Sequence, residues 1–117
     1  MISAVEKIHR LGPKHVIIKK GEHGSFLSSQ AGLFLAPAYP LRKLVDPTGA
    51  GDSFVGGLIG YLASCRGSIQ SNLRRAIIHG TAVASFCCEG FGLTRTTGVD
   101  RKAIESRVKL LEKMARF

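Results

Sequence analysis

The chain has 117 residues, 44% of them hydrophobic and 14 of them glycine, and 17 Lys and Arg against 8 Asp and Glu give it a formal net charge of +9. This composition excludes a disordered chain and a collagen-like repeat, because the apolar content is ordinary and the glycines follow no fixed period, and no apolar run approaches the roughly 18 to 20 residues that span a bilayer. We expect one soluble globular unit, with no membrane partner and with an attraction for anionic ligands.

The first third of the chain predicts a helix followed by short strands. Ser3 and Glu6 have the spacing of a capping box, and apolar residues then recur at helical intervals as far as Gly12. Residues 15–20 form a compact β-branched run, which predicts a buried strand. The segments that follow are predicted as a turn and as three extended pieces: 21–24, 25–29, 33–36 and 42–45.

The second half of the chain predicts helices. A small, apolar run without proline begins a helix between Ala50 and Asp52, and its glycines favour close packing of backbones. Ser68 is placed to cap a second helix that ends near Gly90. A third helix follows Asp100, with its apolar residues on one face and most of its Lys and Arg outside that face. The predicted order along the chain is therefore strands first and helices after them.

Residues 46–54 read Asp-Pro-Thr-Gly-Ala-Gly-Asp-Ser-Phe, an extended approach that turns through glycines into a helix start. Backbone N–H groups at a helix start lack intrahelical acceptors and carry positive partial charge, so residues 49–52 can bind an anion. Asp52 beside them could accept the proton of a hydroxyl during phosphoryl transfer. The alternative is that the glycines only turn the chain and that Asp52 only occupies a favourable first helical turn.

The longer segment 46–59 closely resembles the second signature of the ribokinase-like, or PfkB, family of carbohydrate and nucleoside kinases. The resemblance implies ATP-dependent phosphoryl transfer to a hydroxyl of a sugar or nucleoside, with ATP and Mg²⁺ as cofactors. It implies Asp52 as the catalytic base and an anion hole made by Gly49, Ala50, Gly51 and Asp52. It also implies the C-terminal portion of a three-layer α/β/α ribokinase-like fold.

The resemblance extends to a nucleotide site on both sides of the signature. Upstream, the strand and glycine turn of residues 16–24 look like the family's nucleotide-binding strand, which implies roles for Lys19, Gly21 and Gly24. A phosphate contact by Lys19 is a hypothesis, since many members carry threonine there. Downstream, His79 and Gly90 match the family's adenine-side helix and loop. Without the resemblance, the turn and a lone histidine would be structural features.

Many ribokinase-like enzymes hold a monovalent cation beside the anion hole, and the resemblance implies a K⁺ site here. The residues at matching positions are Asp46, Thr48, Ser85, Cys88, Gly90 and Thr94. For Asp46 the alternative is a side chain that caps the turn ahead of Pro47.

The resemblance covers nearly the whole chain but only the C-terminal part of the family fold. The family's glycine-rich sugar-binding signature and its Asn-x-x-Glu motif lie upstream of the matched strand, and the asparagine of this chain, Asn72, lies in a predicted helix. We therefore expect residues 1–117 to be a single partial domain that carries the nucleotide-binding and catalytic-base portion of a PfkB-type kinase. Because phosphoryl transfer requires both substrates to be positioned, the chain alone is expected to be inactive.

Two other function classes remain open from the sequence. The first is a non-catalytic nucleotide-binding or assembly fragment, in which an exposed half-core forms an oligomer. The second, ranked last, is a basic nucleic-acid-binding module, because the cations are spread along the chain without a dense tract.

The cysteines and the N-terminus indicate a cytoplasmic location. Cys65, Cys87 and Cys88 do not form an even, spaced disulfide framework, so a reducing compartment is expected, with the thiols buried on helices. The N-terminal residues lack the charged and apolar regions of a secretory signal.

Overall fold

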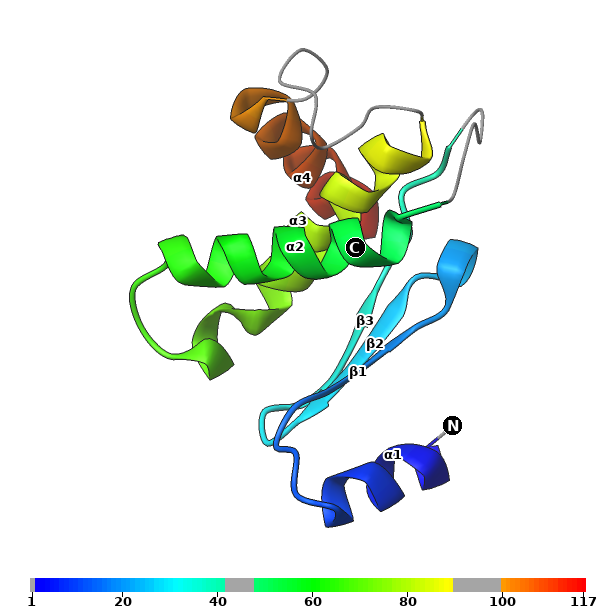
Figure 1. The fold of residues 1–117 in the computed structure, drawn as a ribbon, viewed down its shortest axis with the longest axis vertical. Coiled ribbons are helices and arrows are strands. Elements are labelled where there is room, and N and C mark those ends of the chain that lie inside the picture. The colour runs from blue at the N-terminus through cyan, green and yellow to red at the C-terminus, as the bar shows by residue number, and fades with distance from the viewer. Residues whose placement is uncertain (1, 42–47, 90–99) are drawn as a thin grey trace. The chain divides into compact units, whose positions relative to one another are not determined.

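A computed structural model describes residues 2–41, 48–89 and 100–117 (Figure 1). The chain divides into two compact units, Met1–Ala38 and Tyr39–Phe117. The first contains a small core of Val5, Val16 and Phe26, and the second contains a core of Ala82, Val108 and Leu111. The expectation that residues 1–117 form a single partial domain stays a prediction.

The first unit consists of one α-helix and a three-stranded antiparallel sheet of order β1-β2-β3. The positions of the turn and of the three strands agree with the sequence prediction, but β1 is buried only at Val16, where it packs with Val5 and Phe26, and not along its length as predicted. The prediction that Ser3 caps the helix is wrong, because the helix already includes Ile2 and Ser3 lies inside its first turn. The bounds are α1 Ile2–Arg10, β1 Val16–Lys19, a 3₁₀ turn η1 Gly21–His23, β2 Ser25–Ser29 and β3 Gly32–Ala36.

Helix α1 packs on the sheet through a few apolar side chains and one histidine. Val5 is 3% exposed and packs with Val16 and Phe26. The ring of His9 spans the α1–β1 connection, with Nδ1 2.9 Å from the Pro13 carbonyl oxygen and Nε2 2.9 Å from Ser28 Oγ. A carbonyl oxygen only accepts, so in the neutral ring Nδ1 donates to Pro13 and Nε2 accepts from the Ser28 hydroxyl.

The second unit contains three described helices, α2 (Ala50–Ser64), α3 (Ile69–Cys88) and α4 (Arg101–Ala115). Their predicted starts are confirmed. The Ser68 side chain accepts a 3.1 Å hydrogen bond from Ser71 N–H, and Asp100 Oδ1 accepts a 2.8 Å bond from Ala103 N–H. Both caps pair backbone donors that a helix start leaves without acceptors. The extended segment predicted at 42–45 lies outside the described residues.

Glycines let α2 and α3 approach closely, as their presence in a helix suggested. A β-carbon at Gly57 would lie 2.9 Å from a methyl carbon of Val83, and one at Gly80 would lie 2.6 Å from the Phe54 carbonyl oxygen. Each glycine disfavours an isolated helix by up to roughly 1 kcal/mol relative to alanine, and the packing of the two backbones offsets that loss.

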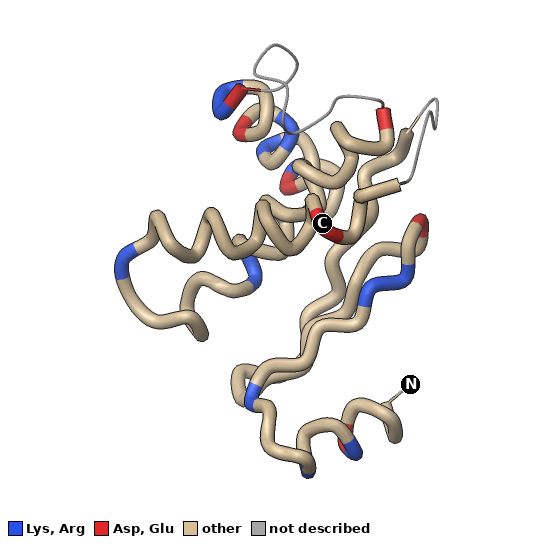
Figure 2. Tube along the Cα trace, viewed as in Figure 1, with Lys and Arg blue, Asp and Glu red and all other residues tan. Residues whose placement is uncertain are grey.

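The Lys and Arg residues are spread over both units and are interspersed with acidic residues on α4 (Figure 2). Helix α4 packs on α3 through Val108 and Leu111, which are 7% and 0% exposed. Among the described segments, no helix has the length and apolar character that crossing a membrane requires.

Candidate functional site

The predicted anion hole lies where the chain enters α2. Gly49 is the N-cap, in the left-handed region at φ 82° and ψ −2°, and its carbonyl oxygen accepts a 2.9 Å hydrogen bond from Ser53 N–H. The N–H groups of Ala50, Gly51 and Asp52 occupy the first three helical positions, which have no acceptor within the helix. The geometry can therefore present several donors and the positive helix end to an anion.

Asp52 is the acidic residue in the first turn of α2, and its side chain is exposed. The next two residues, Ser53 and Phe54, are buried, at 4% and 7% exposure. The turn is thus held on one side by packing while the carboxylate faces outward. This arrangement leaves Asp52 accessible to a hydroxyl substrate, although its role as a base stays a prediction.

The last turn of α3 contacts the approach to α2. Cys87 Sγ donates a hydrogen bond to the Thr48 carbonyl oxygen at 3.5 Å, and a β-carbon at Gly49 would lie 3.8 Å from the same sulfur. The cysteines are half-buried and not disulfide-bonded, and Cys65 follows α2 as its C-cap instead of lying within it. The expectation of buried helical thiols is corrected accordingly, since Cys87 makes a polar contact at the candidate site.

Three of the residues predicted to surround a monovalent cation are described, and they belong to these contacting segments. Thr48 precedes Gly49, and Ser85 and Cys88 lie in the last turn of α3. The Ser85 hydroxyl donates to the Ala82 carbonyl oxygen at 2.6 Å, and its own carbonyl oxygen accepts from Glu89 N–H at 3.1 Å. Asp46, Gly90 and Thr94 lie outside the described residues. The K⁺ site stays a prediction.

A magnesium site is not formed by the described residues alone. No group of three or more His, Cys, Asp or Glu side chains that could hold a metal occurs within residues 2–41, 48–89 and 100–117. Asp52 is the one acidic residue of α2, and Mg²⁺ usually takes one or two carboxylates together with water and substrate phosphates. The described donor set does not fit a dedicated Mg²⁺ cage.

The residues predicted at the upstream nucleotide turn gather at one end of the first unit. Lys19 ends β1, Gly21 begins η1 and Gly24 follows it, with φ values of 58° for Gly21 and 86° for Gly24. A β-carbon at Gly24 would lie 2.1 Å from the Ala36 carbonyl oxygen, so only glycine fits there. Their contacts with a nucleotide stay predictions, and so does the role of Gly90, which lies outside the described residues.

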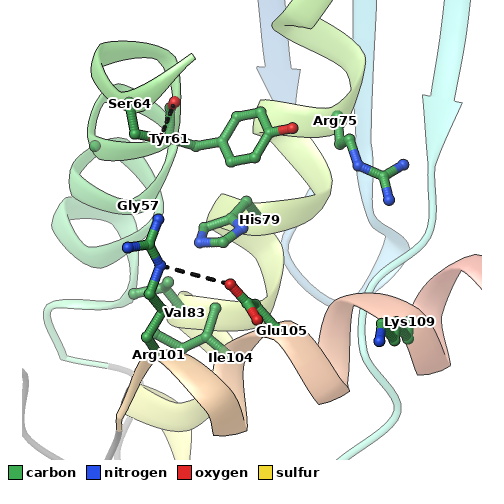
Figure 3. A pocket seen from close by; sticks show the side chains of 11 residues that line it. Gly57, Tyr61, Ser64, Arg75, His79, Val83, Arg101, Ile104, Glu105 and Lys109 are labelled. Carbon is green, nitrogen blue, oxygen red and sulfur yellow. Dashed lines mark hydrogen bonds and ion pairs between the residues drawn. The ribbon is translucent and has the colours of Figure 1, made fainter.

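His79 lies in the second unit, at an open cavity of about 600 Å³ between α2, α3 and α4 (Figure 3). Its ring is 5.0 Å from the Tyr61 ring, centroid to centroid, at 34° between planes. Arg101 and Glu105 of α4 form a 3.5 Å ion pair at the same cavity. The lining residues are Gly57, Gly60, Tyr61, Ser64, Arg75, His79, Val83, Arg101, Ile104, Glu105 and Lys109.

Burial lowers the pKa of His79 below its ordinary value, and Arg101 and Arg75 add to that effect while Glu105 opposes it. Burial, together with a hydrogen bond to Cys65, raises the pKa of Tyr61. Both rings are therefore neutral at neutral pH. A neutral imidazole beside a phenol offers both a donor and an acceptor to a polar heterocycle or a ribose hydroxyl.

The structure also shows residues that the sequence did not single out. Tyr61 joins His79 from a neighbouring helix. Arg107 is one of the Lys and Arg residues of α4, most of which were expected outside the apolar face, but its side chain is 15% exposed and bonds Ser85 and Glu89. No local spacing pairs these residues. The one signal in the sequence for a partly buried Arg107 was its position directly before the apolar Val108.

Residues 1–98 match the family model described as pfkB family carbohydrate kinase. The chain is 34% identical over 110 residues to 1-phosphofructokinase of Escherichia coli strain K12, covering 94% of this chain and 33% of that protein. It spans a third or less of the length of the curated relatives it matches.

Solved structures agree with this match. Ribokinase of Arabidopsis thaliana in complex with ribose and ATP superposes with a TM-score of 0.75 at 30% identity, over 92% of this chain and 33% of that one. Aminoimidazole riboside kinase of Salmonella enterica, in complex with aminoimidazole riboside and an ATP analogue, gives 0.76 at 30% identity, over 91% and 35%. The predicted fold class, part of a ribokinase-like α/β fold, is confirmed. With a family model that matches most of its length and structural neighbours of the same fold, this chain belongs to the pfkB family of carbohydrate kinases.

Proposed function

We propose that this chain is the part of an ATP-dependent kinase that binds phosphate and supplies the catalytic base, and that the kinase acts on a hydroxyl of a sugar or nucleoside. The observation that carries the proposal is the left-handed Gly49 at the start of α2, with exposed Asp52 in the first turn, in a chain of the pfkB family. The relatives support the substrate class, since solved neighbours hold ribose or a riboside with ATP or its analogue.

In the proposed reaction, Asp52 accepts the proton of the acceptor hydroxyl. The hydroxyl oxygen forms a bond to the γ-phosphorus of ATP, and the bond from that phosphorus to the β,γ-bridging oxygen breaks, so that ADP leaves. The N–H groups of residues 49–52 and the positive end of α2 stabilise negative charge on the phosphoryl group. Aligned donors and a base beside the attacking oxygen are what this reaction requires of a protein.

The proposal assigns nucleotide binding to residues that precede α2 in the sequence and to residues that follow it. Lys19, Gly21 and Gly24 would contact the nucleotide from the β1–β2 turn, and His79 and Gly90 would contact its base or ribose. The neutral state of the His79 ring favours hydrogen bonding to a base or ribose over pairing with a phosphate.

The metal ions belong to the same proposal. Mg²⁺ would arrive with ATP and neutralise phosphate charge, with ligands drawn largely from the phosphates and water. A K⁺ ion would be held by oxygen atoms of Asp46, Thr48, Ser85, Cys88, Gly90 and Thr94, where its charge would support the anion hole.

We propose further that the 117-residue chain is inactive by itself. It spans a third or less of the length of its curated relatives, and both substrates must be held for phosphoryl transfer to proceed. The cytoplasmic location expected from the sequence is part of this proposal.

A non-catalytic nucleotide-binding fragment that oligomerises is the second candidate function, because a chain that covers only part of its relatives can bind a nucleotide without turning it over.

The direct test is Asp52→Asn in the full-length protein that contains this chain. We expect kcat to fall by about 10²- to 10⁴-fold, the usual contribution of a positioned base, while the KM for ATP stays within about twofold. Asp100→Asn is the matched control, because asparagine also caps a helix and should leave kcat unchanged. An Asp52→Asn enzyme with undiminished kcat would exclude Asp52 as the base. ATP binding by the 117-residue chain in a titration, together with an oligomer in light scattering, would favour the second candidate.

A further inference from the structure

Arg107 is a charged side chain enclosed by the packing of the second unit. Its guanidinium carbon lies 4.1 Å from the centroid of the Tyr39 ring and 3.7 Å from that of the Phe86 ring. Its side chain is 15% exposed, against 80% for Arg101 on the same helix. Two rings at these distances fix the plane of a guanidinium, which stacks on aromatic faces as a lysine ammonium does not.

From this position Nη1 of Arg107 donates to the last turn of α3 twice. One bond goes to Ser85 Oγ at 3.0 Å and the other to Glu89 Oε1 at 2.5 Å. Glu89 is the C-cap of α3, where a carboxylate meets the negative end of the helix dipole and is disfavoured. The positive charge of Arg107 offsets that repulsion. The Arg107 side chain therefore both orders the end of α3 and neutralises the charge of the Glu89 carboxylate.

The same turn reaches the start of α2. Cys87, which lies between Ser85 and Glu89, donates to the Thr48 carbonyl oxygen at 3.5 Å, and Thr48 directly precedes Gly49. A continuous set of contacts therefore runs from α4 through the end of α3 to the candidate phosphate subsite. A shift of the α3 turn would move the contact that holds Thr48.

We propose that Arg107 is a positioning residue for the phosphate subsite at Gly49–Asp52, an inference that rests on the proposed function. Arg107 holds residues 85–89 in place against Thr48. It also keeps the Glu89 carboxylate paired, so that the carboxylate does not repel the triphosphate of an incoming nucleotide. Both effects increase the affinity for nucleotide phosphates without a direct contact between Arg107 and the reacting atoms.

The test compares the unsubstituted 117-residue chain with Arg107→Gln, Arg107→Lys and the double variant Arg107→Gln with Glu89→Gln. Two quantities are measured: hydrogen exchange at the Ser53 amide, which bonds to Gly49 O, and the Kd for ATP. Arg107→Gln should raise the exchange rate of the Ser53 amide and the Kd for ATP by roughly tenfold each, because a charge-assisted hydrogen bond is lost. Arg107→Lys should speed the exchange with a smaller loss of affinity, because charge is kept and stacking is lost.

The double variant separates the two effects. Removing the Glu89 charge should restore part of the ATP affinity lost in Arg107→Gln, while Ser53 exchange stays fast because the stacked link is still missing. Arg116→Gln is the control, since Arg116 also pairs with a glutamate but is 72% exposed, and it should change neither quantity. Hydrogen exchange at amides in the middle of α4 shows whether each variant is folded. If Arg107→Gln is unfolded, the Ser53 exchange rate of Arg107→Lys is the test of the inference.

The outcomes for Arg107 and for the proposed function are distinguishable. Unchanged Ser53 exchange in the folded Arg107 variants would overturn the inference, whatever their ATP affinity. Failure of the unsubstituted chain to bind ATP would count against a nucleotide site in this chain, and the exchange data, which need no ligand, would still decide the positioning role.

Discussion

Gly80 of α3 faces the Phe54 carbonyl oxygen of α2 so closely that a β-carbon at Gly80 would lie 2.6 Å from that oxygen. Gly80 itself is buried. Because α2 carries Gly49 and Asp52 at its start, this contact helps to set the position of the whole helix against α3. The backbone of α2 can thus approach α3 this closely only because Gly80 has no side chain.

Gly80→Ala is expected to destabilise the second unit, because the added methyl must displace backbone instead of a flexible side chain. A loss of about 1–3 kcal/mol in the free energy of unfolding is the usual cost of overpacking. Gly56→Ala, in α2, is the control, since nothing lies within 4 Å of its β-carbon position. It should stabilise the helix by up to roughly 1 kcal/mol. Urea unfolding followed by circular dichroism measures both changes, and equal stabilities for the two variants would contradict the close contact.

Gly49→Ala tests the left-handed backbone at the start of α2. The site has room for the methyl group, whose nearest neighbour would be Cys87 Sγ at 3.8 Å, so any loss comes from φ 82° and not from a clash. We expect a loss of about 1–2 kcal/mol in unfolding free energy. Gly49→Asn should lose less, because asparagine tolerates the left-handed region better. A tolerated alanine would show that Gly49 adopts another conformation in solution.

The lowered pKa of His79 predicts a pH dependence of stability. Burial favours the neutral ring in the folded state, so the unfolded chain binds the proton more readily. The contribution of the neutral His79 ring to the free energy of unfolding is therefore complete above the ordinary pKa of 6.5. It is lost as the pH falls from 6.5 through the lower pKa of the folded state. Unfolding curves of the unsubstituted chain and of His79→Asn are measured at pH 7.5 and 5.5, about one unit either side of that pKa. The unsubstituted chain should lose more unfolding free energy between these two pH values than the variant does. An equal pH dependence in both would contradict the assignment.

Local signals in the sequence predicted much of the fold. Ser68 caps α3 as expected, α4 follows Asp100 as expected, and the glycine-rich approach enters α2 at Ala50. These features depend on residues three or four apart, whose side chains reach backbone donors regardless of the rest of the chain. The capping box at Ser3 was wrong because α1 already includes Ile2, and Val5 of α1 packs with Val16 on the sheet.

The sequence by itself thus determined where α2, α3 and α4 begin, the strand order along the chain and the signature of residues 46–59 that marks the family. Only the tertiary structure decided which distant side chains meet. The ring of His79 lies against Tyr61 of another helix, and Arg107 bonds Glu89 across 18 residues of chain. A helical pattern assigns Arg107 to a face of α4, but it cannot show that Tyr39 and Phe86 cover that face. Such contacts arise from how whole helices pack, and no spacing within one helix encodes them.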